Sequence, residues 1–205
     1  MTAEVATPLG PAGQHRSEPD GAPAGTLVLG GGAGGSVLTA PDVVAVAEAA
    51  RDAGWRVLRV EQPWRVAGKR IAPAPARLDT GWTAVLAHAR AHGLLTGPLV
   101  LGGRSAGARV ACRTATAEGA AGVLALAFPL HPPGRPERSR AGELGLVGVP
   151  LLVVQGRTDA MGTPEEVRAA ARHARVAAVP GDHSLTQDGP AVAAAVLPWL
   201  AALLT

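Results

Sequence analysis

A single serine between two glycines is the first feature of this sequence that could do chemistry. Ser105 lies in LVLGGRSAGARVA (99–111) and occupies the middle of a G-x-S-x-G pattern. The apolar run before the pattern predicts a strand, and the residues after it favour a helix. A serine at such a sharp strand-to-helix turn is exposed, and the turn needs small neighbours for steric reasons. Ser105 is therefore a candidate nucleophile. The alternative is a serine that only caps the helix.

A serine hydroxyl is a weak nucleophile unless a base removes its proton. His183 follows the last apolar run, in PGDHSL, and Asp159 follows the run before it, in QGRTDAMG. The order Ser105, Asp159, His183 predicts a catalytic triad in which His183 is the general base and Asp159 holds its tautomer. Asp182 is the weaker candidate for the acid, because the immediate neighbour of His183 would have difficulty reaching the same ring.

A serine nucleophile that attacks a carbonyl also needs two N–H donors for the negative oxygen that forms. Ala106, directly after Ser105, is expected to supply one backbone N–H group. The loop after the first apolar run, GGGAGG (30–35), is expected to supply the other, from Ala33 or from Gly32.

Cationic side chains in the neighbouring loops are candidates for substrate binding, since an arginine guanidinium suits a carboxylate. The candidates are Arg65, Arg104, His131 and Arg135. Structural roles remain open for two of them: Arg65 could pair with Glu61, and His131 could pack between two prolines.

The elements that must position these residues alternate along the chain. Six apolar runs predict strands: 26–30, 55–61, 98–103, 122–128, 150–156 and 175–181. Helical patterns lie between them near 41–53, 77–92, 105–118, 164–173 and 190–204. Such alternation predicts a three-layer α/β/α sandwich with a mostly parallel, six-stranded sheet. Sites in such sheets form at the carboxyl ends of the strands, where the candidate residues lie.

Residues 1–25 lack this pattern and are predicted to be a disordered leader that can be removed, so the folded domain is expected to span 26–205. The segment 129–149 has no apolar periodicity that would form a helical lid. We therefore expect an open site that prefers short acyl chains.

Residues 26–205 resemble the small α/β-hydrolase family that is related to testis-expressed protein 30 and to the hydrolase-like subunit of the NSL histone acetyltransferase complex. Bacterial members of this family are close to the dienelactone-hydrolase group. The matching segments are LVLGGGAGG, PWRVAGKR, GGRSAGARVA, PLHPPGRPER, VQGRTDAMGTPEE and GDHSL. The resemblance implies an α/β-hydrolase fold without a cap domain, but it implies no particular substrate. Relatives usually carry histidine where this chain has Gly31, which leaves the backbone donors available but loosens their loop.

Composition limits the partners. A net charge of +3 without a basic, aromatic-interleaved block argues against nucleic acid. The longest apolar run is too short to span a membrane, and a single cysteine, Cys112, suits the cytoplasm. We expect a serine hydrolase, an esterase acting on a small-molecule ester, with no metal and no cofactor, as a monomer or homodimer.

Two other functions remain open. Residues 30–35 also match the dinucleotide fingerprint G-x-G-x-x-G, and Glu61 ends the next strand where a ribose-binding acid would lie. Five residues separate this fingerprint from the predicted helix, which argues against a nucleotide. The second alternative is a non-catalytic, hydrolase-like interaction module.

Overall fold

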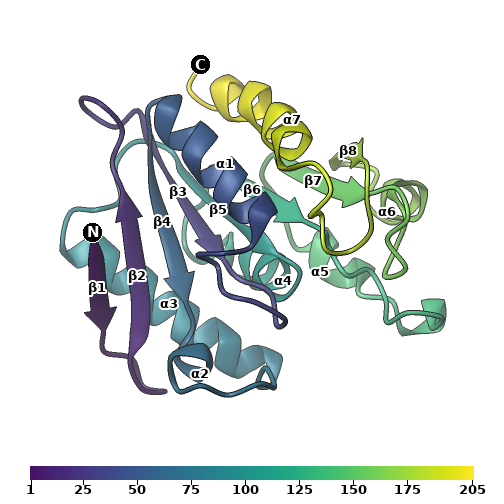
Figure 1. Cartoon of the computed structure of the whole chain (residues 1–205), viewed down its shortest axis with the longest axis horizontal. Coiled ribbons are helices and arrows are strands. Elements are labelled where there is room, and N and C mark those ends of the chain that lie inside the picture. Colours follow the sequence, from purple (N-terminus) through teal and green to yellow (C-terminus); the bar gives the residue numbers. More distant parts are fainter.

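An eight-stranded, mostly parallel β-sheet forms the centre of the computed structural model, which describes residues 1–205 (Figure 1). The strands are β1 (Thr2–Val5), β2 (Ala12–Ser17), β3 (Gly25–Gly30), β4 (Trp55–Glu61), β5 (Leu99–Arg104), β6 (Gly122–Leu126), β7 (Leu151–Gly156) and β8 (Arg175–Val179). Their order across the sheet is β1-β2-β4-β3-β5-β6-β7-β8. Strands β3 to β8 are parallel, so their carboxyl ends meet at one edge, as predicted.

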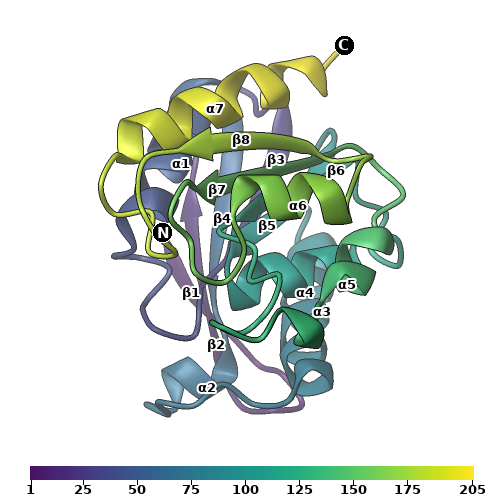
Figure 2. The same ribbon diagram turned by 90° about the vertical axis from the view of Figure 1, so that its right-hand side faces the viewer.

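Helices cover both faces of the sheet, which gives the predicted three layers (Figure 2). They are α1 (Pro41–Asp52), α2 (Pro63–Val66), α3 (Pro75–Ala91), α4 (Ala106–Thr114), α5 (Ala141–Gly145), α6 (Pro164–Ala170) and α7 (Gly189–Ala202), with a 3₁₀ turn at Pro136–Arg138. Helices α1 and α7 lie side by side on one face, while α3, α4, α5 and α6 lie on the other. No helix is both long enough and apolar enough to cross a bilayer.

The amino-terminal segment differs from the prediction of a disordered leader over residues 1–25. Strands β1 and β2 form an antiparallel pair, and β2 is hydrogen-bonded antiparallel to β4. The sheet therefore has eight strands rather than six. Val5 and Ala12 are buried in the core. The sequence pattern misses these strands because the backbone of β4, which would otherwise be an unpaired edge, supplies much of their stabilisation.

Helix α6 begins at Pro164, where the predicted helical range 164–173 begins, and a capping box fixes this start. The Thr163 hydroxyl accepts a hydrogen bond from the Glu166 N–H group at 3.3 Å, and the Glu166 carboxylate accepts one from the Thr163 N–H group at 2.7 Å. This capping box satisfies two backbone donors that the first turn leaves free. Asp188 likewise caps α7, because its carboxylate accepts a hydrogen bond from the Ala191 N–H group at 2.8 Å.

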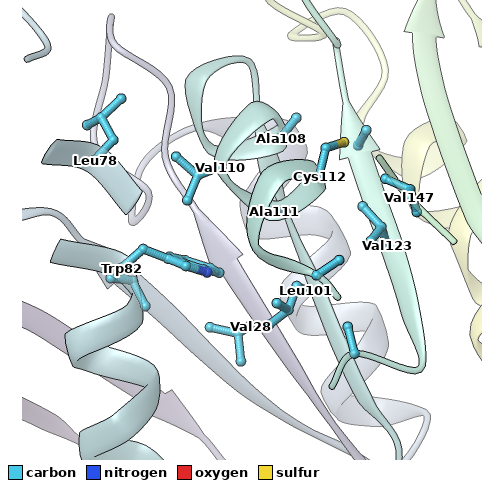
Figure 3. Close-up of a cluster of buried hydrophobic side chains, with 14 of the residues drawn as sticks. Val28, Leu78, Trp82, Leu101, Ala108, Val110, Ala111, Cys112, Val123 and Val147 are labelled. Atoms are coloured by element: carbon cyan, nitrogen blue, oxygen red, sulfur yellow. The ribbon is translucent and has the colours of Figure 1, made fainter. Parts of the chain in front are cut away.

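The central helix α4 packs on the sheet through small side chains. Figure 3 shows Ala108, Ala111 and Cys112 of α4 among apolar side chains of the sheet such as Leu101 and Val123. Small residues let the helix axis approach the sheet closely. Burial raises the pKa of the Cys112 thiol to about 12. The cysteine is therefore a core residue and not a reactive thiol at neutral pH.

Candidate active site

Ser105 occupies a strained turn between β5 and α4. Its backbone has φ +52° and ψ −106°, a conformation that residues with a side chain rarely adopt. A hydrogen bond from the Ser105 N–H group to the Leu126 carbonyl, at 2.9 Å, ties the turn to the end of β6. A methyl group on Gly103 or on Gly107 would collide with the backbone of Gly30. The two glycines therefore allow β3 to approach the turn and hold it in place.

Three side chains from separate loops form one hydrogen-bonded line. The Ser105 Oγ atom lies 2.9 Å from Nε2 of His183, and Nδ1 of the same ring lies 2.8 Å from Oδ2 of Asp159. The Asp159 side chain is fully buried, whereas a quarter of the His183 side chain is exposed. Asp182 lies outside this line. Its carboxylate accepts hydrogen bonds from the backbone N–H and hydroxyl groups of Ser184, which lower the pKa of Asp182.

Gln155 holds the buried aspartate in place, and sequence reasoning missed it. It lies in β7 and is fully buried. Its amide nitrogen donates to Oδ2 of Asp159 at 2.8 Å and to the Gly162 carbonyl at 2.7 Å. Its amide oxygen accepts from the Phe128 N–H group at 2.9 Å. The available signal was a single amide in the otherwise apolar run PLLVVQG.

The glycine-rich loop after β3 lies beside Ser105 and is held by Glu61. The Glu61 carboxylate accepts hydrogen bonds from the Ser36 hydroxyl at 2.6 Å and from the Val37 N–H group at 3.0 Å. Relatives usually carry a histidine at the position of Gly31. In this chain Gly31 packs against Val37 of the same loop. The hydrogen bonds of Glu61 restrain the loop that Gly31 was expected to loosen. They also occupy the carboxylate that a dinucleotide would require for its ribose.

The candidate N–H donors lie close to the serine. A methyl group on Gly32 would contact the Ser105 Cβ atom at 3.5 Å, and Ala33 and Ala106 line the same hollow as Ser105. The N–H groups of Ala33 and Ala106 donate to no backbone or side-chain acceptor of the chain. Donors of this kind are free to bind a developing negative charge.

The hollow in front of Ser105 has a volume of about 270 Å³ and is open to solvent. Its lining residues come mainly from the loops after β3 and β4, from α4 and from the segment after β6: Ala33, Ala72, Pro73, Pro75, Leu78, Ser105, Ala106, Arg109, Arg113, Pro129, Arg140 and Met161. Between Pro129 and Val149 the chain forms only the 3₁₀ turn and the five-residue helix α5. No helical lid covers the hollow.

Arg104, which the sequence predicts to be a substrate-binding residue, does not line the hollow, and its guanidinium group is held within the protein. Its Nη2 atom donates to the His183 carbonyl at 3.1 Å, and its Nε atom lies 3.3 Å from Oδ2 of the buried Asp42. Burial raises the pKa of Asp42, and the charge of Arg104 opposes this shift. Arg104 therefore holds the backbone at His183 in place through its hydrogen bond to the His183 carbonyl group.

His131 and Arg135 also lie outside the hollow. The His131 ring is buried; its Nδ1 atom donates to the Pro132 carbonyl at 3.0 Å and its Nε2 atom lies 3.4 Å from the Glu166 carboxylate. These polar contacts, rather than packing between the two prolines, give His131 a structural role. Arg135 is exposed, and its side chain makes no hydrogen bond or ion pair with the protein.

Arg65 lies behind the glycine-rich loop, where it lines a cleft of only about 10 Å³. Its guanidinium carbon is 5.3 Å from the centre of the Trp64 ring, and it forms no ion pair with Glu61. None of the four predicted substrate-binding residues therefore lines the hollow. The arginines that do so, Arg109, Arg113 and Arg140, were missed. The first two lie four and eight residues after Ser105, a spacing that places them near the serine along α4.

Comparisons with known proteins agree with this fold. Residues 23–191 match a family described as an alpha/beta hydrolase domain. No curated protein is significantly similar to the chain.

Among solved structures, an α/β serine hydrolase homologue from Coxiella burnetii has a TM-score of 0.78 at 19% identity, with 96% of this chain and 94% of that chain covered. A serine hydrolase without a lid from Xanthomonas campestris has a TM-score of 0.75 at 22% identity, with 97% and 94% covered. Est1E from Butyrivibrio proteoclasticus, with ferulic acid bound, has a TM-score of 0.83 at 17% identity, with 98% and 99% covered. Identities this low establish a common fold and nothing further.

Proposed function

The chain belongs to the alpha/beta hydrolase domain family, and from this premise we propose that it is a serine hydrolase that cleaves small carboxylic esters. The single observation that supports the proposal most is the hydrogen-bonded line from Ser105 through His183 to Asp159. It lies at the mouth of an open hollow and begins at a strained turn. A serine that only caps a helix requires neither feature.

The proposed reaction begins when Ser105 Oγ attacks the ester carbonyl while His183 Nε2 removes the hydroxyl proton. The charge of Asp159 stabilises the imidazolium that forms, and its hydrogen bond to Nδ1 keeps the ring in the productive tautomer. The tetrahedral intermediate then collapses. The C–O bond to the alcohol breaks, the alcohol leaves with the proton from His183, and the acyl group remains on Ser105. Water, activated by the same histidine, releases the acid.

The negative oxygen of the tetrahedral intermediate would be bound by the N–H groups of Ala106 and of Ala33, with Gly32 as the alternative second donor. The absence of a protein acceptor for the N–H groups of Ala33 and Ala106 supports these roles. The N–H group at the start of α4 also benefits from the helix dipole. The Glu61 contacts keep the loop that carries Ala33 in position.

Substitution of the serine tests the proposal. Ser105→Ala should lose hydrolysis of p-nitrophenyl acetate by about 10⁴-fold or more and should lose labelling by a fluorophosphonate probe. Its thermal midpoint should stay close to that of the wild type, because little packing is lost. Ser17→Ala, whose hydroxyl makes no hydrogen bond, is the control that should keep both activities. Hydrolysis by Ser105→Ala within about tenfold of the wild type would remove Ser105 from the mechanism. Absence of labelling in the wild type would favour the non-catalytic interaction module.

The open hollow supports a preference for short acyl chains, because no lid and few large apolar side chains could enclose a long one. The same absence of a cap supports a place in the small lidless group that includes the relatives of testis-expressed protein 30. p-Nitrophenyl esters from acetate to palmitate, compared by kcat/KM, measure the preference. Fastest cleavage of the longest chains would contradict it.

A further inference from the structure

One wall of the hollow in front of Ser105 is built from three arginines, while much of the rest is apolar. Arg109 and Arg113 project from α4, and Arg140 lies just before α5. Each of the three side chains is partly buried. The apolar part of the lining includes Ala72, Pro73, Pro75, Leu78, Pro129 and Met161. The hollow thus presents positive charge at one side and apolar surface along most of the remainder.

Two carboxylates neutralise only part of this positive wall. Glu143 accepts hydrogen bonds from Arg109 at 2.6 and 2.7 Å and from Arg113 at 3.1 Å. Asp79 accepts two hydrogen bonds from Arg113, at 2.6 and 2.9 Å. Arg140 has no carboxylate partner. Three guanidinium groups therefore face two carboxylates, and one positive charge is left over beside the serine.

The positive charge that no carboxylate pairs with is that of Arg140. Its Nη1 atom donates to the Pro129 carbonyl at 2.7 Å, which fixes the side chain and leaves Nε and Nη2 without an acceptor. Arg109 uses Nε and Nη2 for Glu143 and keeps Nη1 free. Burial and the nearby charge of Arg109 lower the pKa of Arg140 by more than the charge of Glu143 raises it, as expected for a cation without a directly bonded counter-ion. Donors in such a setting bind an anion strongly.

We infer that the hollow binds esters whose acyl part ends in a carboxylate, namely the mono-esters of short dicarboxylic acids, and that Arg140 is the residue that selects them. This inference rests on the proposed esterase function, because it places the ester carbonyl at Ser105. The methylene groups of such a substrate lie along the apolar lining, and its carboxylate accepts hydrogen bonds from Arg140 and from the free Nη1 atom of Arg109. The hollow is smaller than the ~300–1,000 Å³ typical of sites for drug-sized ligands, which suits a short acid.

The test compares monoethyl glutarate with ethyl pentanoate. The two esters share the same acyl chain length and differ in the terminal group, which is a carboxylate in one and a methyl group in the other. Hydrolysis is followed by acid release at constant pH. In the wild type, kcat/KM should favour the glutarate ester by about tenfold or more, and Arg140→Met should reduce that preference by a similar factor. Arg172→Met, which removes an exposed arginine without an ion-pair partner, should keep the wild-type preference.

The ratio of the two kcat/KM values separates recognition from structural damage, because a merely structural loss would slow both esters equally. A second readout is independent of catalysis: calorimetric binding of monoethyl glutarate to Ser105→Ala, and to Ser105→Ala combined with Arg140→Met. The first should bind, and the second should bind at least about tenfold more weakly.

The outcomes distinguish the two ideas. Binding that depends on Arg140 without hydrolysis of either ester would overturn the esterase function and keep the carboxylate site. Hydrolysis of both esters with equal kcat/KM, unchanged in Arg140→Met, would overturn the carboxylate site and keep the esterase function. Neither hydrolysis nor binding would overturn both.

Discussion

Replacing Gln155 by leucine should destabilise the protein strongly, although the two side chains are similar in size. Gln155 forms four hydrogen bonds inside the core. The Phe128 carbonyl keeps a second partner, the Leu130 N–H group at 2.9 Å, and Asp159 keeps His183. The Phe128 N–H group and the Gly162 carbonyl lose the only hydrogen-bond partners they have.

The magnitude follows from these two orphaned backbone groups. Each buried, unsatisfied group costs about 1–3 kcal/mol, so Gln155→Leu should lower the free energy of unfolding by about 2–6 kcal/mol. Domains typically have a total of about 5–15 kcal/mol. Urea unfolding can be followed by the fluorescence of the four tryptophans. With a slope of about 2 kcal/mol per M, the midpoint should fall by about 1 M or more.

Gln14 provides a matched control in the same sheet. It is also buried, but its amide nitrogen has no hydrogen-bond partner. Gln14→Leu should therefore leave the midpoint unchanged or raise it. Equal urea midpoints for Gln155→Leu and Gln14→Leu would show that the hydrogen bonds of Gln155 do not stabilise the fold.

Three further perturbations have defined outcomes. Deleting residues 1–20 should lower the thermal midpoint by several degrees and promote aggregation, since it exposes the edge of β4; an unchanged midpoint would show that β1 and β2 contribute nothing. Gly107→Ala should reduce both soluble yield and the proposed esterase activity because its methyl group collides with the backbone of Gly30, whereas Gly142→Ala, where a methyl group meets nothing, should be neutral in both measurements. Burial raises the pKa of Glu143, but the hydrogen bonds and charges of Arg109 and Arg113 outweigh it and hold the pKa below its ordinary value. The ion pairs of Glu143 therefore stabilise the folded protein fully above the ordinary pKa of a glutamate, and this stabilisation is lost as the pH falls through the lower pKa of Glu143 in the folded state. The difference in thermal midpoint between wild type and Glu143→Gln should consequently shrink from pH 7 to pH 3. A constant difference would contradict this.

The sequence predicts the parallel part of the sheet and the order of its helices because these elements have strong local signals. Strands β3, β5, β6 and β7 are short apolar runs that are buried almost throughout, and α6 has a capping box that can be read from Thr163 and Glu166. The grouping of Ser105, Asp159 and His183 follows from topology, because parallel strands bring their carboxyl ends to one edge.

The missed features depend on contacts between distant residues. Strand β2 has little apolar character of its own and is stabilised by pairing with β4. Arg104 and Arg140 both lie next to loops on the site side, yet only the fold shows that the first is taken up by Asp42 and His183 while the second has no carboxylate partner. Residue type and position along the chain do not reveal which charges remain unpaired.

The open hollow also bears on which step can limit the rate of turnover. In enzymes with a mobile lid, opening or closing of that lid often limits turnover. Here the segment between Pro129 and Val149 contains only a 3₁₀ turn and one short helix, and nothing folds over Ser105. In the proposed reaction, a substrate therefore reaches Ser105, and a product leaves it, without the opening of a lid. Water has the same access, so release of the acyl group in the second proposed step needs no rearrangement of the chain.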